Sequence, residues 1–380
     1  MGLRADINRT KAYLCLECGI CTGSCPVSRV HPEYSPRLTV ERSLLFGETE
    51  TVCDPELWSC LTCGTCDARC PSQVDFTGFM RALRGRAREL GEEGTCTHAD
   101  TLSALMELMM MPDFNRSPAW LGKSVKTKKR GKTYYFAGCL PFLEVVFKDI
   151  GFDGKTLARS AVKLLNHIGI EPAVSEHEIC CGHDAYWTGK PEITERFAAQ
   201  NVEAIRKSGA KEVIFSCPEC YYMFKHVYPD LLGDLGFEPI FIMKLLAEHS
   251  EALGLKPTEA KVTYHDPCRL ARMDDIIEEP RTLLGAVPDL ELVEMERRGK
   301  DALCCGSSNF VSCSRVNKRI QVERLEEAIG TGAGTLLTSC PKCNIHLRCA
   351  MHDQDTSGEI EIKDMITLLA ERAGGGKRGA

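Results

Sequence analysis

The sequence has no long uninterrupted apolar segment. Its richest apolar stretch, Leu102 to Met111, is short and contains Glu107, whereas a helix needs about 18 apolar residues to span a bilayer. The first residues also lack the charged start and apolar core of a signal peptide. We therefore expect a globular, soluble protein of the cytoplasm that reaches a membrane only through a partner.

Two further absences argue against two classes of function, enzymes with a flavin or nicotinamide cofactor and nucleic-acid-binding proteins. No Gly-x-Gly-x-x-Gly follows a predicted strand, so a flavin or nicotinamide site is not indicated. The segment Gly330–Gly334 follows a helical pattern and is interpreted as a loop. The net charge is only −6, and the single basic cluster, Lys123 to Lys132, lacks interleaved aromatic residues. This cluster indicates a solvated linker or a docking surface for an acidic partner, and not a nucleic-acid site.

Cysteine, by contrast, is abundant, with 22 residues in a chain of 380. Disulfide scaffolds are short secreted chains, so a reducing compartment and metal ligation fit this sequence better. Eight of the cysteines form two copies of the spacing C-x2-C-x2-C-x3-C-P. They are Cys15, Cys18, Cys21 and Cys25 before Pro26, and Cys60, Cys63, Cys66 and Cys70 before Pro71.

This spacing is the ligand run of a two-cluster ferredoxin, in which the fourth cysteine of each run reaches the other cluster. One [4Fe-4S] cubane cluster is then expected on Cys15, Cys18, Cys21 and Cys70, and a second on Cys60, Cys63, Cys66 and Cys25. A zinc site is disfavoured because zinc requires pairs of ligands and not runs of four. The chain is therefore predicted to transfer electrons.

Hydrophobic spacing predicts the surroundings of these runs. Apolar residues recur at helical intervals over Leu38–Phe46 and Phe79–Leu90. We therefore expect an α-helical ferredoxin domain over residues 1–100. A helix near Ala99–Met111 and the basic linker would complete residues 101–132.

From Thr133 the pattern changes to short β-rich runs that alternate with helical segments, which predicts a multidomain chain ending in α/β, Rossmann-like domains. The expected strands are Thr133–Ala137, Glu212–Ser216, Lys261–His265 and Thr335–Thr338, and the expected helices are Lys155–His167, Thr194–Ser208 and Val316–Ile329. Each strand leads directly to a cysteine. In open α/β sheets functional groups gather at the carboxyl ends of the strands, so these cysteines are expected at one edge.

This region is also an internal duplication. Cys139, Cys180-Cys181-Gly182 and Cys217-Pro218-Glu219-Cys220 recur in the same order as Cys268, Cys304-Cys305-Gly306 and Cys340-Pro341-Lys342-Cys343. Two domains are expected, over residues 133–257 and 258–372, followed by a disordered tail over 373–380.

Each half offers five thiols, one more than a cubane cluster needs. Thiolates are soft ligands suited to iron and sulfide, and adjacent cysteines can hold neighbouring metals. The glycine after each pair, Gly182 or Gly306, lets the backbone pass close to a bulky cluster. The prolines of the last motif, Pro218 and Pro341, stiffen the loop that carries two ligands.

The doubled C-x(n)-CCG-x(n)-CP-x-C pattern resembles the paired cysteine-rich domains of heterodisulfide reductase, and residues before it resemble that family's ferredoxin subunit. The resemblance implies two noncubane [4Fe-4S] clusters, in each of which a three-iron and a two-iron unit share an iron, with a disulfide substrate split between them. It assigns to the first cluster Cys139, Cys180, Cys181, Cys217 and Cys220, and to the second Cys268, Cys304, Cys305, Cys340 and Cys343.

Several residues near the motifs have weaker signals. His183 follows the first Cys-Cys-Gly and is a candidate proton donor to a departing thiolate, with a structural hydrogen bond as the alternative. His265 and Asp266 precede Cys268, and Asp266 is interpreted as a turn residue. The four cysteines outside the motifs are expected to be buried thiols; they are Cys53, Cys96, Cys313 and Cys349.

Three functions remain at this point. In the first, the chain is a disulfide reductase subunit that reduces the coenzyme M–coenzyme B heterodisulfide or an analogue and docks to a flavoprotein. That flavoprotein could be electron-bifurcating, with a hydrogenase or formate dehydrogenase behind it. In the second, the same catalytic unit receives its electrons from a membrane cytochrome b. In the third, the chain is only a relay, as in glycolate- or lactate-oxidising complexes. Two complete motifs favour disulfide reduction.

Overall fold

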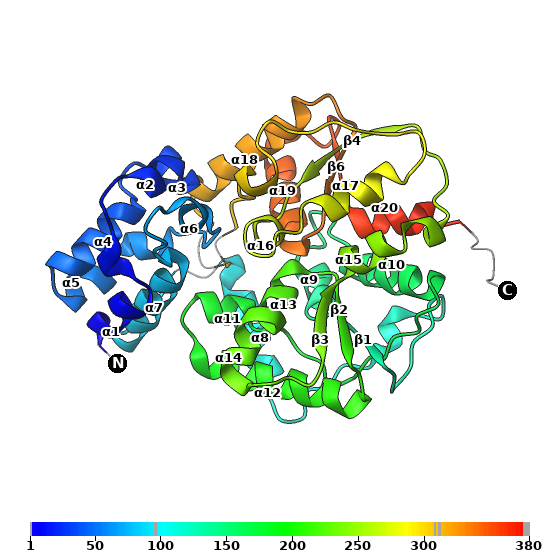
Figure 1. Ribbon diagram of the computed structural model, residues 1–380, viewed down its shortest axis with the longest axis horizontal. Coiled ribbons are helices and arrows are strands. Elements are labelled where there is room, and N and C mark those ends of the chain that lie inside the picture. The colour runs from blue at the N-terminus through cyan, green and yellow to red at the C-terminus, as the bar shows by residue number, and fades with distance from the viewer. Residues whose placement is uncertain (1, 95–96, 308, 311–312, 375–380) are drawn as a thin grey trace.

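The computed structural model describes residues 2–94, 97–307, 309–310 and 313–374. A helical N-terminal part lies at one end of the long axis, and two α/β halves lie side by side beyond it (Figure 1). The predicted fold class is therefore confirmed. The two halves each contain a parallel sheet that is flanked by helices.

The N-terminal part consists of short helices packed around one longer helix. They are α1 (Leu3–Arg9), η1 (Ala12–Leu14), α2 (Ile20–Ser24), α3 (Pro26–Val30), α4 (Pro36–Leu45), α5 (Glu48–Val52), η2 (Pro55–Trp58), α6 (Thr65–Arg69) and α7 (Phe76–Glu89). Asp75 is the N-cap of helix α7, and its carboxylate accepts the Gly78 N–H at 2.8 Å. Its buried face carries Phe79, Met80 and Leu83. Helices α4 and α7 correspond to the two predicted from hydrophobic spacing.

The connector packs on the first α/β half. It contains η3 (His98–Asp100), α8 (Thr101–Met109) and η4 (Pro118–Leu121). Met109 and Leu121 are buried in the core of the first half. The lysines of the basic cluster are exposed, and the Lys128 ammonium pairs with Glu171 at 3.2 Å.

The first half has a sheet of order β1-β2-β3, and the second has one of order β5-β4-β6-β7. The strands are β1 (Thr133–Phe136), β2 (Glu212–Phe215), β3 (Glu238–Phe241), β4 (Ala260–His265), β5 (Leu290–Leu292), β6 (Thr335–Thr338) and β7 (Glu361–Asp364), and all pairs are parallel. The four predicted strands are confirmed within one residue. The three that sequence analysis missed, β3, β5 and β7, all lie at sheet edges, where Pro239 and charged residues are tolerated.

Helices cover both sheets. Those of the first half are α9 (Leu140–Val146), α10 (Gly154–His167), α11 (His183–Trp187), α12 (Pro191–Ser208), α13 (Pro218–Tyr222), the π-helical turn η5 (Met223–Val227), α14 (Tyr228–Leu232), α15 (Ile242–Glu248) and η6 (Ser250–Leu253). Those of the second half are α16 (Cys268–Ala271), α17 (Glu278–Gly285), η7 (Gly299–Asp301), α18 (Arg315–Ile329), α19 (Pro341–Gln354) and α20 (Met365–Arg372). Residues 330–334 form the predicted loop before β6. Ala373, which was predicted to start the tail, pairs with Leu255.

The two halves meet through equivalent helices. Helix α10 of the first half packs on α20, the last helix of the second half. The equivalent contact with the halves exchanged joins α17 of the second half to α15 of the first. The Lys163 ammonium extends across the first of these contacts and donates to the Ala370 carbonyl at 2.7 Å. The duplication therefore produces an approximately symmetric pair and not two independent domains.

The N-terminal part contacts both halves. The guanidinium of Arg84 is fully buried and donates to the carbonyls of Leu57 and Cys60 in its own part, at 3.1 and 2.8 Å, and to that of Trp187 in the first half at 3.1 Å. Arg29 pairs with Glu323 of the second half at 2.6 Å. These contacts fix the N-terminal part over the seam between the halves.

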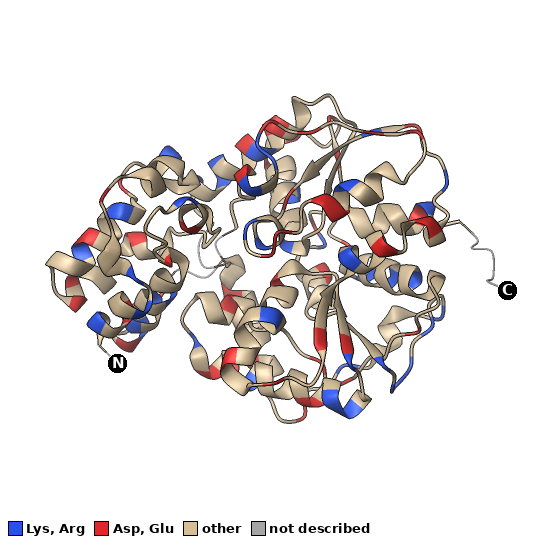
Figure 2. Cartoon of the chain, viewed as in Figure 1, with Lys and Arg blue, Asp and Glu red and all other residues tan. Residues whose placement is uncertain are grey.

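Acidic and basic residues are not segregated into separate regions of the molecule. Figure 2 shows acidic and basic residues interspersed over all three parts. Within the described residues, no helix has the length and apolar character needed to cross a membrane.

We expect Gly189→Ala to destabilise the docking of the N-terminal part. Gly189 has a φ of +74°, and an added Cβ would lie 2.6 Å from the Cα of Gly85 in α7. The loss should be about 2–5 kcal/mol, from left-handed strain plus overpacking. Gly209→Ala is the matched control, because Gly209 has a φ of +79° with nothing within 4 Å of its added Cβ. Equal thermal unfolding midpoints for the two variants would contradict this prediction.

A second prediction concerns Asp364, which caps α20 by accepting the Ile366 N–H at 2.9 Å. Burial raises the pKa of this carboxyl from 3.8 to about 7. Between these values the folded chain holds a proton that the unfolded chain has lost, so stability falls as pH rises from about 4 to 7. Asp364→Asn keeps a good cap and should remove a slope of up to about 1.4 kcal/mol per pH unit. Chemical unfolding across this range tests it; parallel profiles for the two proteins would contradict it.

Candidate metal centres

The two N-terminal cysteine runs fold alike. In each run the third cysteine lies on a short helix, α2 or α6, and these two helices contact each other. The fourth cysteine then precedes a proline. Cys25 is the N-cap of α3, and Cys70 ends α6, where its sulfur accepts the Val74 N–H at 3.4 Å.

One run is buried together with the last cysteine of the other. A single cavity is lined by Cys60, Cys63 and Cys66 and also by Cys25. Burial raises the pKa of Cys25 to about 12, and the charges of Cys63 and Cys60 add to the shift. Four thiols around one cavity fit a four-iron cluster, and the inclusion of Cys25 is what the crossed ligand rule requires.

The other run lies nearer the surface. Cys18 is exposed, and Cys15 and Cys21 are half-buried. Apolar side chains beside them face solvent, with Tyr13 at 55% and Leu16 at 71% exposed. Burial and the neighbouring Cys15 and Cys18 raise the pKa of Cys21.

In the first α/β half, five thiols from three separate segments line one cavity. They are Cys139 after β1, Cys180 and Cys181 before α11, and Cys217 and Cys220 after β2. These thiols lie close enough to shift one another's pKa: Cys180 raises the pKa of Cys139 and of Cys181, and Cys139 lowers that of Cys180. The opposite wall is apolar and includes Leu102, Met106, Met109 and Phe310. The parallel sheet therefore gathers these cysteines as predicted.

A buried carboxylate holds two of these segments in place. Glu178 Oε1 accepts the N–H groups of Ala137 and Gly138, at 3.2 and 2.9 Å, and pairs with Arg116 at 2.6 Å. Its Oε2 accepts the Tyr134 hydroxyl at 3.0 Å. Because Glu178 stands two residues before Cys180, it ties that loop to the turn that carries Cys139. Sequence analysis missed this residue, since no motif contains it.

The second half repeats the arrangement. Cys268, Cys304, Cys305, Cys340 and Cys343 line one cavity. Gly306 after the Cys-Cys pair has a φ of +78°, and an added Cβ would lie 2.9 Å from the Asn317 carbonyl oxygen. Asp266 lies between β4 and α16 as expected, and Arg281 also binds both its oxygens at 2.8 and 2.9 Å.

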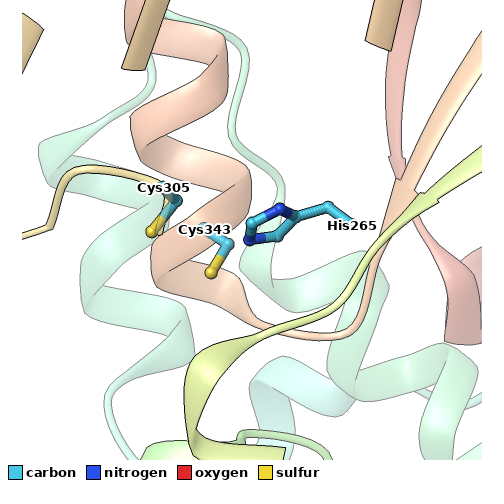
Figure 3. Close-up of side chains that lie close together, drawn as sticks. All are labelled: His265, Cys305 and Cys343. Carbon is cyan, nitrogen blue, oxygen red and sulfur yellow. The ribbon is translucent and has the colours of Figure 1, made fainter. Parts of the chain in front are cut away.

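One histidine distinguishes the second cavity from the first. Figure 3 shows the His265 ring beside the sulfurs of Cys305 and Cys343, and the ligand atoms of all three lie within 4.8 Å of one another. Arg324 donates to His265 Nδ1 at 3.0 Å, so the ring proton is on Nε2, which faces these sulfurs. His265 therefore turns its Nε2–H toward these two sulfurs, and burial lowers the pKa of the ring.

The second cavity also adjoins the N-terminal part. The neighbouring thiols of Cys268, Cys305 and Cys63, the last from the ferredoxin-type run, raise the pKa of Cys304. Arg269 stabilises this junction: it is buried and donates to the carbonyl and hydroxyl oxygens of Thr62 at 2.7 and 2.9 Å. Two predicted ligand sets thus meet directly across a domain boundary.

His183 lies in the wall of the first cavity. Arg269 donates to its Nε2 at 3.1 Å, so its ring proton is on Nδ1. Nδ1 lies 3.5 Å from Glu219 Oε2 and 3.6 Å from Asp184 Oδ1. Burial lowers the pKa of His183, so the ring is neutral.

The remaining cysteines are not all buried. Cys53 and Cys313 are exposed, so that prediction is wrong for both, and Cys349 is half-buried. Cys53 caps the short surface helix α5, and Cys313 lies in the loop before α18, where no core is available. The Cys349 sulfur accepts from the Lys318 ammonium at 2.8 Å. Cys96 lies outside the described residues.

Comparison with known proteins agrees with this geometry. The family model of the cysteine-rich domain, CCG, matches residues 133–225 and 262–348, and that of a 4Fe-4S dicluster domain matches residues 11–74. The chain therefore belongs to the iron–sulfur proteins that join a dicluster domain to paired cysteine-rich domains. Iron–sulfur clusters, as predicted, are the cofactors that these domains indicate.

Within this family the chain is similar to the D subunit of heterodisulfide reductases. It is 32% identical over 274 residues to the D subunit of the dihydromethanophenazine:CoB–CoM heterodisulfide reductase of Methanosarcina barkeri, over 70% of this chain and 64% of the relative. It is 28% identical over 376 residues to the B subunit of the fumarate reductase (CoM/CoB) of Methanothermobacter marburgensis, over 93% of this chain and 71% of the relative. The chain spans less than two thirds of the length of the D subunits that it matches.

We expect Glu178→Gln to destabilise the loops that line the first cavity. The variant keeps an oxygen for the two backbone donors but removes the buried negative charge that pairs with Arg116, a loss of about 3–5 kcal/mol. Iron bound by the first half should decrease with it. Glu144→Gln is the control, because Glu144 also accepts a backbone N–H, from Lys155 at 2.8 Å, but lies away from the thiols. Thermal unfolding and iron analysis of both variants test this; equal iron contents would contradict it.

Proposed function

We propose that this protein is an iron–sulfur oxidoreductase subunit that takes electrons from a partner and reduces a disulfide between its two α/β sites. The observation that carries the proposal is the junction at Cys63, where Arg272 and Arg269 of the second half donate to the carbonyls of Cys63 and Thr62 at 3.2 and 2.7 Å and the neighbouring Cys304 lowers the pKa of Cys63. It joins the ferredoxin-type run to a complete five-thiol site, so the chain offers a continuous route from a surface cluster to a buried cavity.

The ligand sets follow from the cavities. One cubane [4Fe-4S] cluster would be held by Cys15, Cys18, Cys21 and Cys70, and the other by Cys60, Cys63, Cys66 and Cys25. The five thiols of each α/β half would hold a noncubane [4Fe-4S] cluster. When bound, these groups supply single electrons and an iron that stabilises a thiolate.

The chain's own residues provide the rest of the chemistry. Reducing a disulfide to two thiols consumes two electrons and two protons. His183 lies in the wall of the first cavity and is our candidate to relay one of these protons: once protonated to the imidazolium, it would release its Nδ1 proton to a departing thiolate and return to the neutral ring. The apolar wall from α8 excludes water, which favours transfer to the substrate.

The electron donor would dock at the exposed end of the N-terminal part. The thiols of Cys15 and Cys18 are nearest to solvent there, and the exposed Leu16 and Tyr13 give an apolar contact around them. The donor would be a flavoprotein, electron-bifurcating where a hydrogenase or formate dehydrogenase supplies it, or alternatively a membrane cytochrome b. The name of the Methanosarcina relatives gives dihydromethanophenazine as the counterpart of the CoB–CoM heterodisulfide in those proteins.

A relay without substrate chemistry is the second candidate. It is favoured by similarity to proteins of other activities, including a probable iron-sulfur-binding oxidoreductase of Bacillus subtilis, 28% identical over 223 residues that cover 57% of this chain and 31% of the relative. Against it, both halves keep all five thiols around a cavity, and the first cavity has space and an apolar wall in front of them.

Anaerobic purification tests the proposal. The unmodified chain should contain about sixteen irons, four for each of four clusters. Cys181→Ser and Cys305→Ser should each lose about four of them, whereas Cys53→Ser, at an exposed cysteine outside the motifs, should keep all. Addition of an oxidised dithiol should produce a new paramagnetic resonance signal. A chain with only about eight irons would refute the proposal, and intact clusters without that signal would favour the relay.

A further inference from the structure

The two Cys-Pro-x-Cys motifs differ in charge at their variable position. That position is Glu219 in the first half and Lys342 in the second, and the Lys342 ammonium lies 2.9 Å from Glu219 Oε2. Asp184, three residues after Cys181, also pairs with Lys342. The Lys342 side chain is 4% exposed and Glu219 is 14% exposed. Equivalent positions of the duplication therefore form a buried ion pair with each other.

This pair lies between the two candidate metal centres. Glu219 and Lys342 line the cavity of the first half and also that of the second. Each residue stands between two predicted ligands of its own half, so the ion pair connects the two loops that carry those thiols. Both motifs begin a helix at proline, α13 at Pro218 and α19 at Pro341, which keeps the backbone around the pair rigid.

We propose that Lys342, with Glu219 and Asp184, is a positioning clamp that sets the separation and the electronic coupling of the two metal centres. The proposal rests on the proposed function, because both halves must hold a cluster. A charged pair suits this task better than apolar packing, since its energy in a low-dielectric interior depends strongly on distance. A buried ion pair also has little net stabilising value, so stability alone does not account for its presence.

The clamp is connected to the N-terminal part. His183 Nδ1 faces Glu219, and Arg269 links His183 Nε2 to Thr62, next to Cys63. Two cations and two carboxylates alternate along this route, so the charges sum to zero and the group can be buried. Lys342 also lies 4.7 Å from the centroid of the Phe310 ring, in the wall of the first cavity.

The test uses the full, anaerobically loaded chain with three changes: Lys342→Met, Lys342→Arg, and the neutral triple variant Asp184→Asn, Glu219→Gln, Lys342→Met. The triple variant leaves Arg269 as the one buried charge of this group, and Arg269 keeps its hydrogen bonds to His183 and to both oxygens of Thr62, so the variant should fold. The readouts are iron content, the magnetic interaction between the reduced centres in paramagnetic resonance, and disulfide reduction.

We expect Lys342→Met and the triple variant to keep their iron and to lose the magnetic interaction. Disulfide reduction should fall about 100-fold, the loss that a 1 Å misplacement can cause. Lys342→Arg should retain most of the magnetic interaction and most of the disulfide reduction. A triple variant with full iron and an unchanged interaction overturns the clamp, and so does one that fails to fold or bind iron, since the group is then needed for folding and not for positioning.

Failure of the proposed function would be visible separately. The unmodified chain would then lack iron in its α/β halves, before any variant is compared. A wild-type chain with all clusters and an interaction that none of the variants changes would leave the function intact and refute only the clamp.

Discussion

The burial of thiols beside one another is the constraint on which this structure depends. Each α/β half brings five thiols around one cavity, where burial disfavours the charged form of a thiol. Metal ligation requires the ionised form, so the protein must hold the loops together before the ligands can offset this cost. Buried arginines and carboxylates do so: Glu178 with Arg116 in the first half, Arg281 with Asp266 in the second, and Arg84 between the N-terminal part and the first half. The polar interior is therefore a consequence of the ligand sets.

The duplicated halves pack against each other through equivalent helices, but their two cysteine sites are not equivalent. The contacts of α10 with α20 and of α15 with α17 repeat between the halves, but the surroundings of the two cavities differ. The second is bordered by Arg269, His265 and the loop of Cys63, which supply positive charge and hydrogen-bond donors to sulfur. The first faces the apolar side of α8. Donors to sulfur raise the reduction potential of an iron–sulfur centre, so in the proposed function the second site favours receiving electrons and the first favours holding substrate.

Sequence patterns predicted the parts of this structure that local chemistry controls. The four core strands could be recognised because each is apolar and ends at a cysteine, and the repeated motif revealed the two ligand sets. Edge strands such as β7 were missed, since β7 has only four residues and the polar Asp364 occupies one of its two buried positions. Cys53 and Cys313 were assigned to the core because cysteine is usually buried, yet both lie where the chain offers no core. Contacts between distant segments, such as Arg269 with Thr62, had no signal at all. The opposite charges of Glu219 and Lys342 could have been noticed, because aligning the duplicated motifs puts them at one position.

The N-terminal part breaks the symmetry of the pair, and this determines the direction of the proposed route. A single dicluster domain can contact only one of two equivalent sites with the same loop. Cys63 here reaches Cys304, while Arg84 and Gly85 of α7 pack against the first half at Trp187 and Gly189, away from its thiols. In the proposed function the first half would therefore support the N-terminal part and the second would be its electronic contact. Because Leu61 and Thr62 border the second cavity, a disulfide between the two sites would have its space on the side of the first, whose lining also includes Pro341 and Lys342 of the second half. The same docking contact would thus give different tasks to two sites with the same set of five cysteines.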